Sequence, residues 1–211
     1  MKDIKNLECL LPNTQDLLLE LIDNCEFLHK YVLCGGSALA LYLCHRKSED
    51  LDFFTYGDSF DLQEIFNYLN TFDNAQIINQ SSEQVDAIVD GVKLTFFNSK
   101  WFFLKPKKVK QFNLSSIDSI AGMKVNTLFL RAKYRDYYDL YCLTKDKMSL
   151  KEIFNSGLSI MPNISFKLFA MALVYVEDIE DDNIEYLDPV ESIDKNRIGV
   201  FFKNKLKSYS L

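Results

Sequence analysis

The chain has 211 residues, of which 48% are hydrophobic, and this length suffices for one large core or two small ones. Its formal net charge of −6 argues against a general nucleic-acid-binding protein. No apolar stretch approaches the roughly 18 residues of a membrane span, and the N-terminus lacks the basic-then-apolar pattern of a signal peptide, so we expect a cytoplasmic protein.

The cysteines are five in number: Cys9, Cys25, Cys34, Cys44 and Cys142. Because the number is odd and the spacing contains no paired metal-ligand pattern, we predict reduced, buried thiols rather than disulfides or a zinc site. The two histidines are too few for a histidine-based metal site.

The first predicted element is a helix over residues 14–30, where Leu17, Leu21 and Leu28 recur at helical spacing after an Asn-Thr start. The apolar run Tyr31–Cys34 follows and is typical of a short strand.

A glycine pair, Gly35-Gly36, comes directly after this strand and allows a tight turn with close backbone approach to a ligand. Ser37 is predicted to cap a short helix that runs to Leu43. The N-terminus of that helix would offer free amides and a positive dipole end to a triphosphate.

Residues Asp50 to Phe54 are predicted to form a second strand. Alternation with period two places the Asp50 and Asp52 carboxylates on one face, with Leu51 and Phe53 on the other. Two carboxylates about 7 Å apart along a strand can share divalent metal ions.

The next predicted elements alternate between helix, strand and turn. They are a helix over Phe60–Leu69 started by Asp58 or Ser59, strands over Ala75–Gln80, Gln84–Val89 and Val92–Phe97, a hairpin turn at Asp90-Gly91, and a short strand over Trp101–Leu104. Residues 105–110, which include Pro106, are expected to cross between two domains.

From Ser115 onward the pattern becomes helical. Ser115 and Asp118 resemble a capping pair, and the helical pattern continues with few breaks to about Leu143. Further helices are predicted near residues 149–154, 165–176 and 193–207. We therefore expect an α+β fold, with a mixed sheet and flanking helices in residues 1–110 and a helical bundle in residues 111–211.

Charge is distributed unevenly along the chain. Residues 100–147 hold eleven Lys and Arg against four Asp and Glu, whereas residues 177–194 hold nine acidic residues and no Lys or Arg. The basic segment could hold a triphosphate or an RNA backbone, or it could be a solvated face balanced by the acidic segment. Both interpretations stay open.

Three ordered motifs occur between about residues 30 and 145. Gly35-Gly36-Ser37 followed by Asp50-x-Asp52 resembles the signature of the DNA polymerase beta-like nucleotidyltransferase superfamily. A later helical segment resembles the "K, then R, then RDxxDL" region of the AbiEii/AbiGii toxin family. Its matching residues are Lys124, Arg131, Arg135, Asp136, Asp139 and Leu140, and Arg46 and Ser48 fit the same family's Arg-x-Ser-x-Asp-x-Asp version of the second motif.

This resemblance implies a polymerase beta-like domain and transfer of a nucleotidyl group from a nucleoside triphosphate with Mg²⁺ or Mn²⁺. It assigns catalysis to Asp50, Asp52, Lys124 and Asp139, metal binding to Asp50 and Asp52, and nucleotide binding to Gly35, Gly36, Ser37, Arg46, Lys124, Arg131 and Arg135. Lys124, Arg131 and Asp139 would be contributed by the helical domain. It also implies a toxin whose acceptor is the 3′ end of tRNA and whose partner is an antitoxin.

Two alternatives to this function remain. One is transfer to a protein or a small molecule instead of RNA. The other is a degenerate fold that binds a nucleotide or partner without turnover. The second is motivated by Thr95, which stands where relatives in the superfamily usually carry a third metal-binding carboxylate. Asp86 or Asp139 could compensate, and the sequence does not decide between them.

On an unbroken helix, Lys124, Arg131 and Arg135 would lie within about 40° of one another, a stripe suited to clamping triphosphate oxygens. We then expect that removing the Lys124 amine barely changes stability. Alternatively, Lys124 and Arg131 belong to a solvated face. Asp136 and Asp139 could instead form ion pairs along the helix.

Two aromatic groups, Trp101-Phe102-Phe103 and Tyr137-Tyr138-Tyr141, could stack a nucleobase, although core packing is the more common role of such groups.

Overall fold

The computed structural model describes residues 4–55, 60–101, 104, 106–109, 112–180 and 183–209. The chain forms two compact units, Met1–Ser116 and Ile117–Leu211, each with its own core. The division falls six residues beyond the boundary suggested by the sequence. Among the described residues, no helix combines the length and apolar character needed to cross a membrane.

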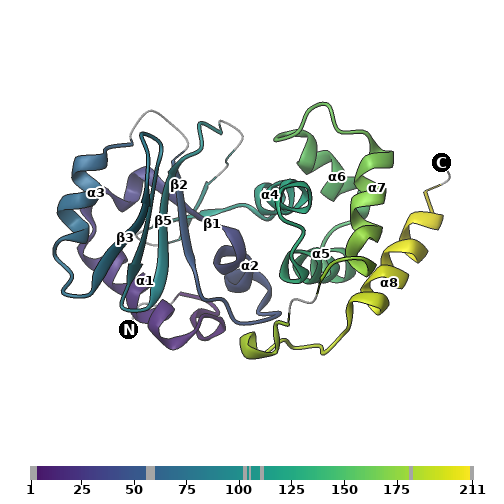
Figure 1. Cartoon of the computed structure of the whole chain (residues 1–211), viewed down its shortest axis with the longest axis horizontal. Helices are drawn as coiled ribbons and strands as arrows, with labels where there is room; N and C mark the ends of the chain where they lie inside the picture. Colours follow the sequence, from purple (N-terminus) through teal and green to yellow (C-terminus); the bar gives the residue numbers. More distant parts are fainter. Residues whose placement is uncertain are drawn as a thin grey trace. The chain divides into compact units, whose positions relative to one another are not determined.

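The first unit consists of a sheet and its flanking helices (Figure 1). In chain order its elements are η1 (Leu7–Cys9), α1 (Pro12–Asn24), η2 (Glu26–Lys30), β1 (Tyr31–Cys34), α2 (Gly35–Leu43), β2 (Leu51–Thr55), α3 (Leu62–Leu69), β3 (Ala75–Gln80), β4 (Gln84–Val89), β5 (Val92–Asn98), β6 (Pro106–Val109) and β7 (Phe112–Ser115).

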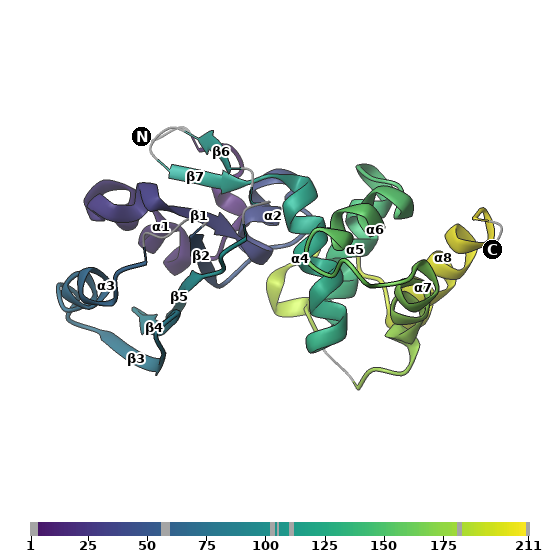
Figure 2. The ribbon, with the colours of Figure 1, turned by 90° about the horizontal axis from the view of Figure 1, so that it is seen from above.

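The strands form one mixed sheet in the order β3-β4-β5-β2-β1-β7-β6. β1 pairs antiparallel with β2 and parallel with β7, and β2 pairs parallel with β5. Figure 2 shows β7 and β6 on one side of β1, with β4 and β3 at the opposite edge. The expected mixed sheet with flanking helices is confirmed.

The two faces of this sheet differ in chemistry. α1 and α3 cover one face, and α2 lies on the other (Figure 1). Residues of β2 alternate between the two faces, with Leu51 and Phe53 fully buried and Asp52 and Phe54 partly exposed. The face that carries Asp52 is called the acid face below.

The bounds of two predicted helices in the first unit need correction. The helix predicted over residues 14–30 begins at Pro12 and ends at Asn24, because Cys25 takes an extended conformation and a separate 3-10 turn follows. The N-cap of α3 is Asp61, whose carboxylate accepts from two backbone amides at 2.9 and 3.1 Å; Asp58 and Ser59 lie outside the described residues.

The segment predicted to cross between domains is a strand instead. Residues Pro106–Val109 form β6, which pairs antiparallel with β7 inside the first unit. The proposed strand over Trp101–Leu104 is not formed at its two ends, and its middle residues lie outside the described part of the chain.

The second unit is helical. Its elements are α4 (Ile117–Leu130), α5 (Tyr134–Asp146), α6 (Leu150–Leu158), α7 (Phe166–Val174), η3 (Tyr175–Glu177), η4 (Glu185–Leu187) and α8 (Lys195–Lys207). Its fully buried side chains include Ile120, Leu140, Phe169 and Phe202.

The long helix expected to reach about Leu143 is broken between α4 and α5. Ala132 adopts a left-handed conformation with φ of 45°, and the Thr127 carbonyl accepts from the amides of both Arg131 and Ala132. This geometry ends α4. Arg135 therefore lies on a different helix from Lys124, and the predicted common stripe on one helix does not exist.

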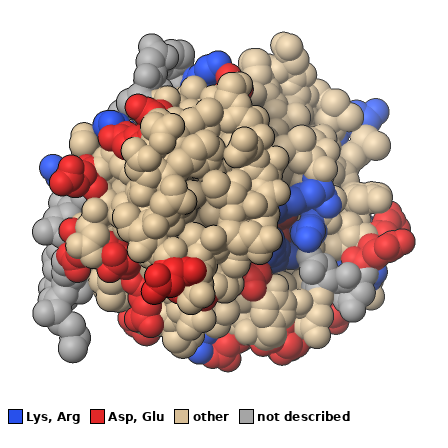
Figure 3. Space-filling model, turned by 60° about the vertical axis from the view of Figure 1, so that its left-hand side comes forward, with Lys and Arg blue, Asp and Glu red and all other residues tan. Residues whose placement is uncertain are grey.

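The surface is rich in acidic side chains, in keeping with the net charge of −6. Figure 3 shows Asp and Glu spread in several groups over the face in view.

Candidate active site

Two glycines at the start of α2 let neighbouring side chains approach the backbone closely. Gly35 has a φ of 69°, and a Cβ atom there would lie 2.5 Å from Oδ2 of Asp52. A Cβ at Gly36 would lie 2.9 Å from Nη2 of Arg46 and 3.2 Å from Oγ of Ser48. Asp52 and Arg46 thus contact the first turn of α2 because these positions carry no side chain.

Ser37 lies inside α2 and does not cap it, which corrects the sequence-based expectation. Its hydroxyl donates to the Asp50 carbonyl and is also hydrogen-bonded to the Ser48 hydroxyl, with the two Oγ atoms 3.0 Å apart. The side chain therefore joins α2 to the segment that leads into β2. Arg46 in that segment is only 3% exposed, and its Nη1 donates to the Lys47 carbonyl at 2.9 Å.

Residues 6–14, called the N-terminal clasp below, hydrogen-bond to the segment between α2 and β2. The Leu11 amide donates to the Ser48 carbonyl at 2.9 Å, and the Ser48 amide donates to the Cys9 carbonyl at 3.1 Å. The Thr14 hydroxyl donates to the Glu49 carbonyl at 2.9 Å. The loop between α2 and β2 is thereby fixed at several points.

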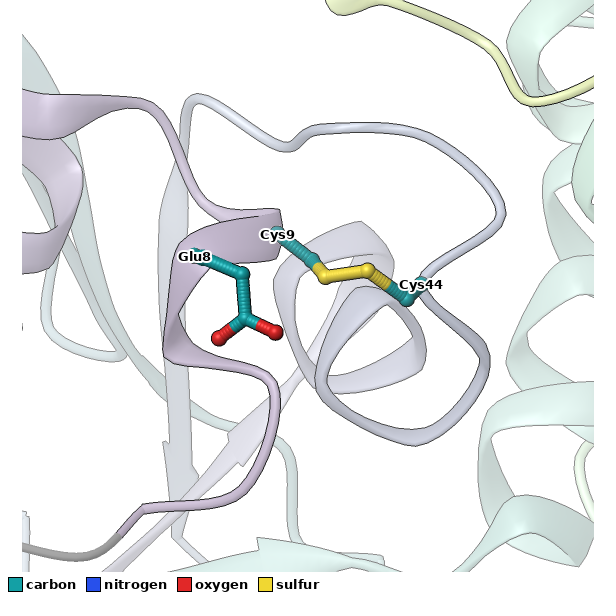
Figure 4. Close-up of side chains that lie close together, drawn as sticks. All are labelled: Glu8, Cys9 and Cys44. Carbon is teal, nitrogen blue, oxygen red and sulfur yellow. A yellow bond between two sulfur atoms is a disulfide. The ribbon is translucent and has the colours of Figure 1, made fainter.

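A disulfide between Cys9 and Cys44 completes the clasp, so the prediction of reduced thiols was wrong for this pair. The two Cα atoms are 5.3 Å apart, although the residues are 35 positions apart in the chain. Figure 4 shows the bond between η1 and the end of α2, with Glu8 nearby. Sequence spacing cannot reveal a contact between segments so far apart along the chain.

The other three cysteines are buried free thiols, as predicted. Burial raises the pKa of Cys25 and of Cys142 to about 12, so these thiols stay protonated near neutral pH.

Breaking the disulfide is expected to lower the free energy of unfolding by about 4 kcal/mol, because the bond closes a long loop in the unfolded chain. Urea unfolding of the wild type with and without dithiothreitol measures this effect. A Cys9→Ser/Cys44→Ser double variant is the control and should not respond to dithiothreitol. Five titratable thiols in the denatured, unreduced wild type would contradict the prediction.

A row of paired residues crosses the acid face at Asp52. Asp52 lies opposite Cys34 on β1 and opposite Thr95 on β5, and Thr95 in turn lies opposite Asp86 on β4. Directly paired residues point to the same face of a sheet. Thr95 therefore occupies the position where a third carboxylate is expected, and the carboxylate of Asp86 lies one strand further along the same row.

Asp86 is held by several donors. Its Oδ1 accepts from the Thr95 hydroxyl at 2.7 Å, and its Oδ2 accepts from Asn79 at 3.0 Å and Gln84 at 2.8 Å. Burial alone would raise the pKa of Asp86, but these hydrogen bonds outweigh it and lower the pKa. An ionised carboxylate therefore lies in the same row as Asp52.

Replacing Thr95 with aspartate is expected to destabilise the first unit by about 1–3 kcal/mol, because it removes a donor from Asp86 and places a carboxylate between two others. Thr95→Ser keeps the hydroxyl and should match the wild type in urea unfolding. If Thr95→Asp were fully stable and more active at low Mg²⁺, position 95 would instead be the place of a missing third metal ligand.

Lys124, in the second unit, lies inside a buried ion-pair network rather than on a solvated face. It is 4% exposed, and its Nζ lies 2.9 Å from Oδ1 of Asp136 and 2.5 Å from Oδ2 of Asp139. Arg131 donates to Asp136 from Nε and Nη2, each at 2.9 Å, and its side chain is 42% exposed.

Asp136 joins the two cations. Burial alone would raise the pKa of Asp136, but the Lys124 ammonium and the Arg131 guanidinium outweigh it and hold the pKa at about 2. Asp136 is part of the helical motif, but the sequence does not show that this one carboxylate binds both cations.

The structure thus groups the expected site residues in two sets. Within the first unit it brings together Gly35, Gly36, Ser37, Arg46, Asp50 and Asp52, and within the second unit it brings together Lys124, Arg131 and Asp139. Arg135 lies beyond the helix break, on α5. Tyr137, Tyr138 and Tyr141 are buried, which favours core packing over base stacking.

Comparisons with known proteins bear on the family of this chain. Residues 16–103 match the AbiEii family, described as nucleotidyl transferase toxins of type IV toxin–antitoxin systems. An uncharacterized protein of Aquifex aeolicus is 30% identical over 205 residues, which cover 94% of this chain and 97% of that protein.

Two solved structures share the fold. The nucleotidyltransferase toxin MenT4 of Mycobacterium tuberculosis is 14% identical, with a TM-score of 0.64 over 92% of this chain and 80% of that one. The JHP933 protein of Helicobacter pylori is 21% identical, with a TM-score of 0.55 over 92% of this chain and 90% of that one. The motifs, the fold and the family match lead to one conclusion: this chain belongs to the AbiEii family of nucleotidyltransferase toxins.

Proposed function

We propose that the protein transfers a nucleotidyl group from a nucleoside triphosphate to an acceptor hydroxyl in a metal-dependent reaction. The observation that carries this proposal is the contact between Asp52 and the first turn of α2, where a Cβ on Gly35 would lie 2.5 Å from the carboxylate. The N-terminus of α2, which would bind phosphate, and a carboxylate that would bind metal are thus adjacent.

The residues present fit a divalent cation. Asp50 and Asp52 offer carboxylate oxygens, which Mg²⁺ and Mn²⁺ prefer, and the absence of a side chain at Gly35 lets Oδ2 of Asp52 lie against the first turn of α2. Bound there, the cation would neutralise charge on the phosphates and lower the pKa of the acceptor hydroxyl.

We assign the remaining roles to named groups. The backbone amides at Gly35, Gly36 and Ser37 would bind the β- and γ-phosphates at the positive end of α2. Arg46 would add positive charge at the same turn, since its guanidinium contacts Gly36.

From the second unit, Lys124 and Asp139 are assigned to catalysis on the strength of the motif, and Arg131 and Arg135 to the triphosphate. The ion pairs of Lys124 with Asp136 and Asp139 fix the position of its ammonium group.

The proposed acceptor is RNA, with the 3′ end of tRNA as the first candidate, and the proposed setting is the cytoplasm with an antitoxin as partner. The family description, a toxin of type IV toxin–antitoxin systems, supports the antitoxin part of this proposal. A degenerate binding module is the second candidate, because Thr95 and not an acid lies opposite Asp52.

Incubation with each α-³²P-labelled nucleoside triphosphate, Mg²⁺ or Mn²⁺, and total cellular RNA or protein tests the proposal. We expect label on an RNA band with one preferred nucleotide. Label on a protein band would assign the acceptor to the protein alternative. Nucleotide binding by calorimetry without transfer at any metal concentration would favour the binding module.

A further inference from the structure

Three aromatic side chains form a cluster next to Asp52. The ring centroids of Phe54 and Phe97 are 5.2 Å apart, and those of Phe54 and Trp101 are 5.8 Å apart. Phe97 and Trp101 are separated by 6.4 Å, and all three contacts are edge to face. Phe54, Phe97 and Trp101 are called the aromatic cluster below.

The aromatic cluster lies on the acid face of the sheet. Phe54 is two residues after Asp52 on β2, and Phe97 is two residues after Thr95 on β5, so alternation puts all four side chains on one face. Phe53 and Phe96, on the opposite face, are both 0% exposed. The rings of the aromatic cluster, by contrast, remain partly exposed.

A hydrogen-bonded turn holds Trp101 in this position. The buried Ser99 hydroxyl donates to the Thr55 carbonyl at 2.6 Å and accepts from the Trp101 amide at 3.3 Å. Lys100 between them has a φ of 51°, in the left-handed region that non-glycine residues adopt at a cost. The chain therefore turns back so that the indole lies against the two phenylalanines.

The aromatic cluster and the glycine turn lie on opposite sides of Asp52. Gly35 follows Cys34, which pairs with Asp52, so the turn lies towards the start of β2. Phe54 lies about 7 Å from Asp52 towards the end of β2. In an in-line displacement the attacking and leaving oxygens occupy opposite sides of the phosphorus. If the glycine turn binds the leaving pyrophosphate, the acceptor enters from the side of the aromatic cluster.

We propose that the aromatic cluster binds the terminal base of a single-stranded nucleic-acid acceptor, whose hydroxyl is thereby placed beside Asp52. This proposal rests on the proposed function. It restricts the acceptor of the transfer reaction to a molecule that carries a planar ring next to the reacting hydroxyl. Partly exposed aromatic rings beside a phosphate site suit a base, because each base offers a flat face for stacking.

Trp101 is the only tryptophan of the chain, so its fluorescence reports directly on the aromatic cluster. The probe is an RNA trinucleotide with a 3′-deoxy end, which can bind but cannot accept a nucleotide. We expect saturable quenching of Trp101 by this probe. A trinucleotide that lacks only its terminal base should bind about tenfold more weakly, which corresponds to the loss of one stacked base. This comparison uses the wild-type protein and needs no variant.

Variants then locate the binding site. Phe54→Leu and Phe97→Leu should each weaken binding of the trinucleotide about tenfold while Trp101 remains as the reporter. Phe72→Leu, which changes an aromatic residue elsewhere in the first unit, is the matched control and should bind normally. Thermal melting checks that each variant is folded.

Calorimetric titration with inorganic tripolyphosphate separates this proposal from the proposed function. Tripolyphosphate should bind the wild type and Phe54→Leu with the same affinity, because the glycine turn, and not the aromatic cluster, would bind it. Failure of tripolyphosphate to bind the wild type would count against the proposed function alone. Equal binding of the complete and the base-lacking trinucleotide would overturn the acceptor proposal. Quenching by a nucleoside triphosphate but not by the trinucleotide would also overturn it, since the aromatic cluster would then bind the donor base.

Discussion

Replacing Asp52 with asparagine should reduce nucleotidyl transfer by more than about a hundredfold, because in the proposed reaction Asp52 would bind the metal directly, and loss of a residue that only supports a metal ligand already costs about 10- to 100-fold. The side chain keeps its size, so its contact with the first turn of α2 is preserved. The measurement is the rate of label incorporation from the preferred α-³²P nucleoside triphosphate at saturating Mg²⁺. Asp50→Asn should show a loss of the same kind.

Asp73→Asn is the matched control, since Asp73 is an exposed acid of the same unit. It should transfer at the wild-type rate, and all three variants should melt cooperatively near the wild-type temperature. A transfer rate within a few-fold of wild type in both Asp50→Asn and Asp52→Asn would remove these residues from the catalytic site.

Replacing Lys124 with methionine should destabilise the protein by about 3–5 kcal/mol, because a buried cation is removed from between two buried carboxylates. This outcome reverses the expectation from the sequence that the Lys124 amine matters little for stability. Urea unfolding at pH 7 measures the loss. The triple variant Lys124→Met/Asp136→Asn/Asp139→Asn should recover part of it, because the unpaired charges are then absent.

The pH dependence of stability should distinguish wild type from Lys124→Met. In the wild type the folded-state pKa of Asp136 lies below its unfolded value, so its contribution to stability is present above about pH 4 and is lost as the pH falls towards 2. In the variant, Asp136 no longer has the Lys124 ammonium that lowers its pKa, so its protonation costs less stability and the difference in stability from wild type should shrink as the pH falls. If Lys124→Met lost little free energy of unfolding, or lost the same amount at pH 7 and pH 4, the ion-pair network would contribute little to stability.

The sequence predicted the first five strands and the glycine turn because their signals are local. Apolar alternation, the Asp90-Gly91 hairpin turn and the Gly35-Gly36 break each lie within a few residues. The grouping of Gly35, Ser37 and Asp52 also followed from a short motif. The structure supplied the reason for both glycines, which is the close approach of Asp52 and Arg46 to the backbone.

The missed features depend on contacts that a local pattern does not contain. β6 carries Lys107 and Lys108 at the sheet edge and has little apolar signal. The helix break at Ala132 occurs in a residue with high helix propensity, with no proline or glycine to mark it. Burial of Lys124 depends on Asp136 and Asp139, which belong to the next helix.

The N-terminal clasp makes this domain sensitive to shortening at its N-terminal side. The first residues of a domain usually tolerate trimming, because few contacts hold them. Here a deletion as short as the first fourteen residues would remove the partners of Glu49 and Ser48 and one half of a covalent crosslink. The loop carrying Arg46 would then keep its contacts to α2 through Ser37 and Gly36 but lose those to the clasp. Affinity tags and fusions should therefore leave residues 6–14 intact.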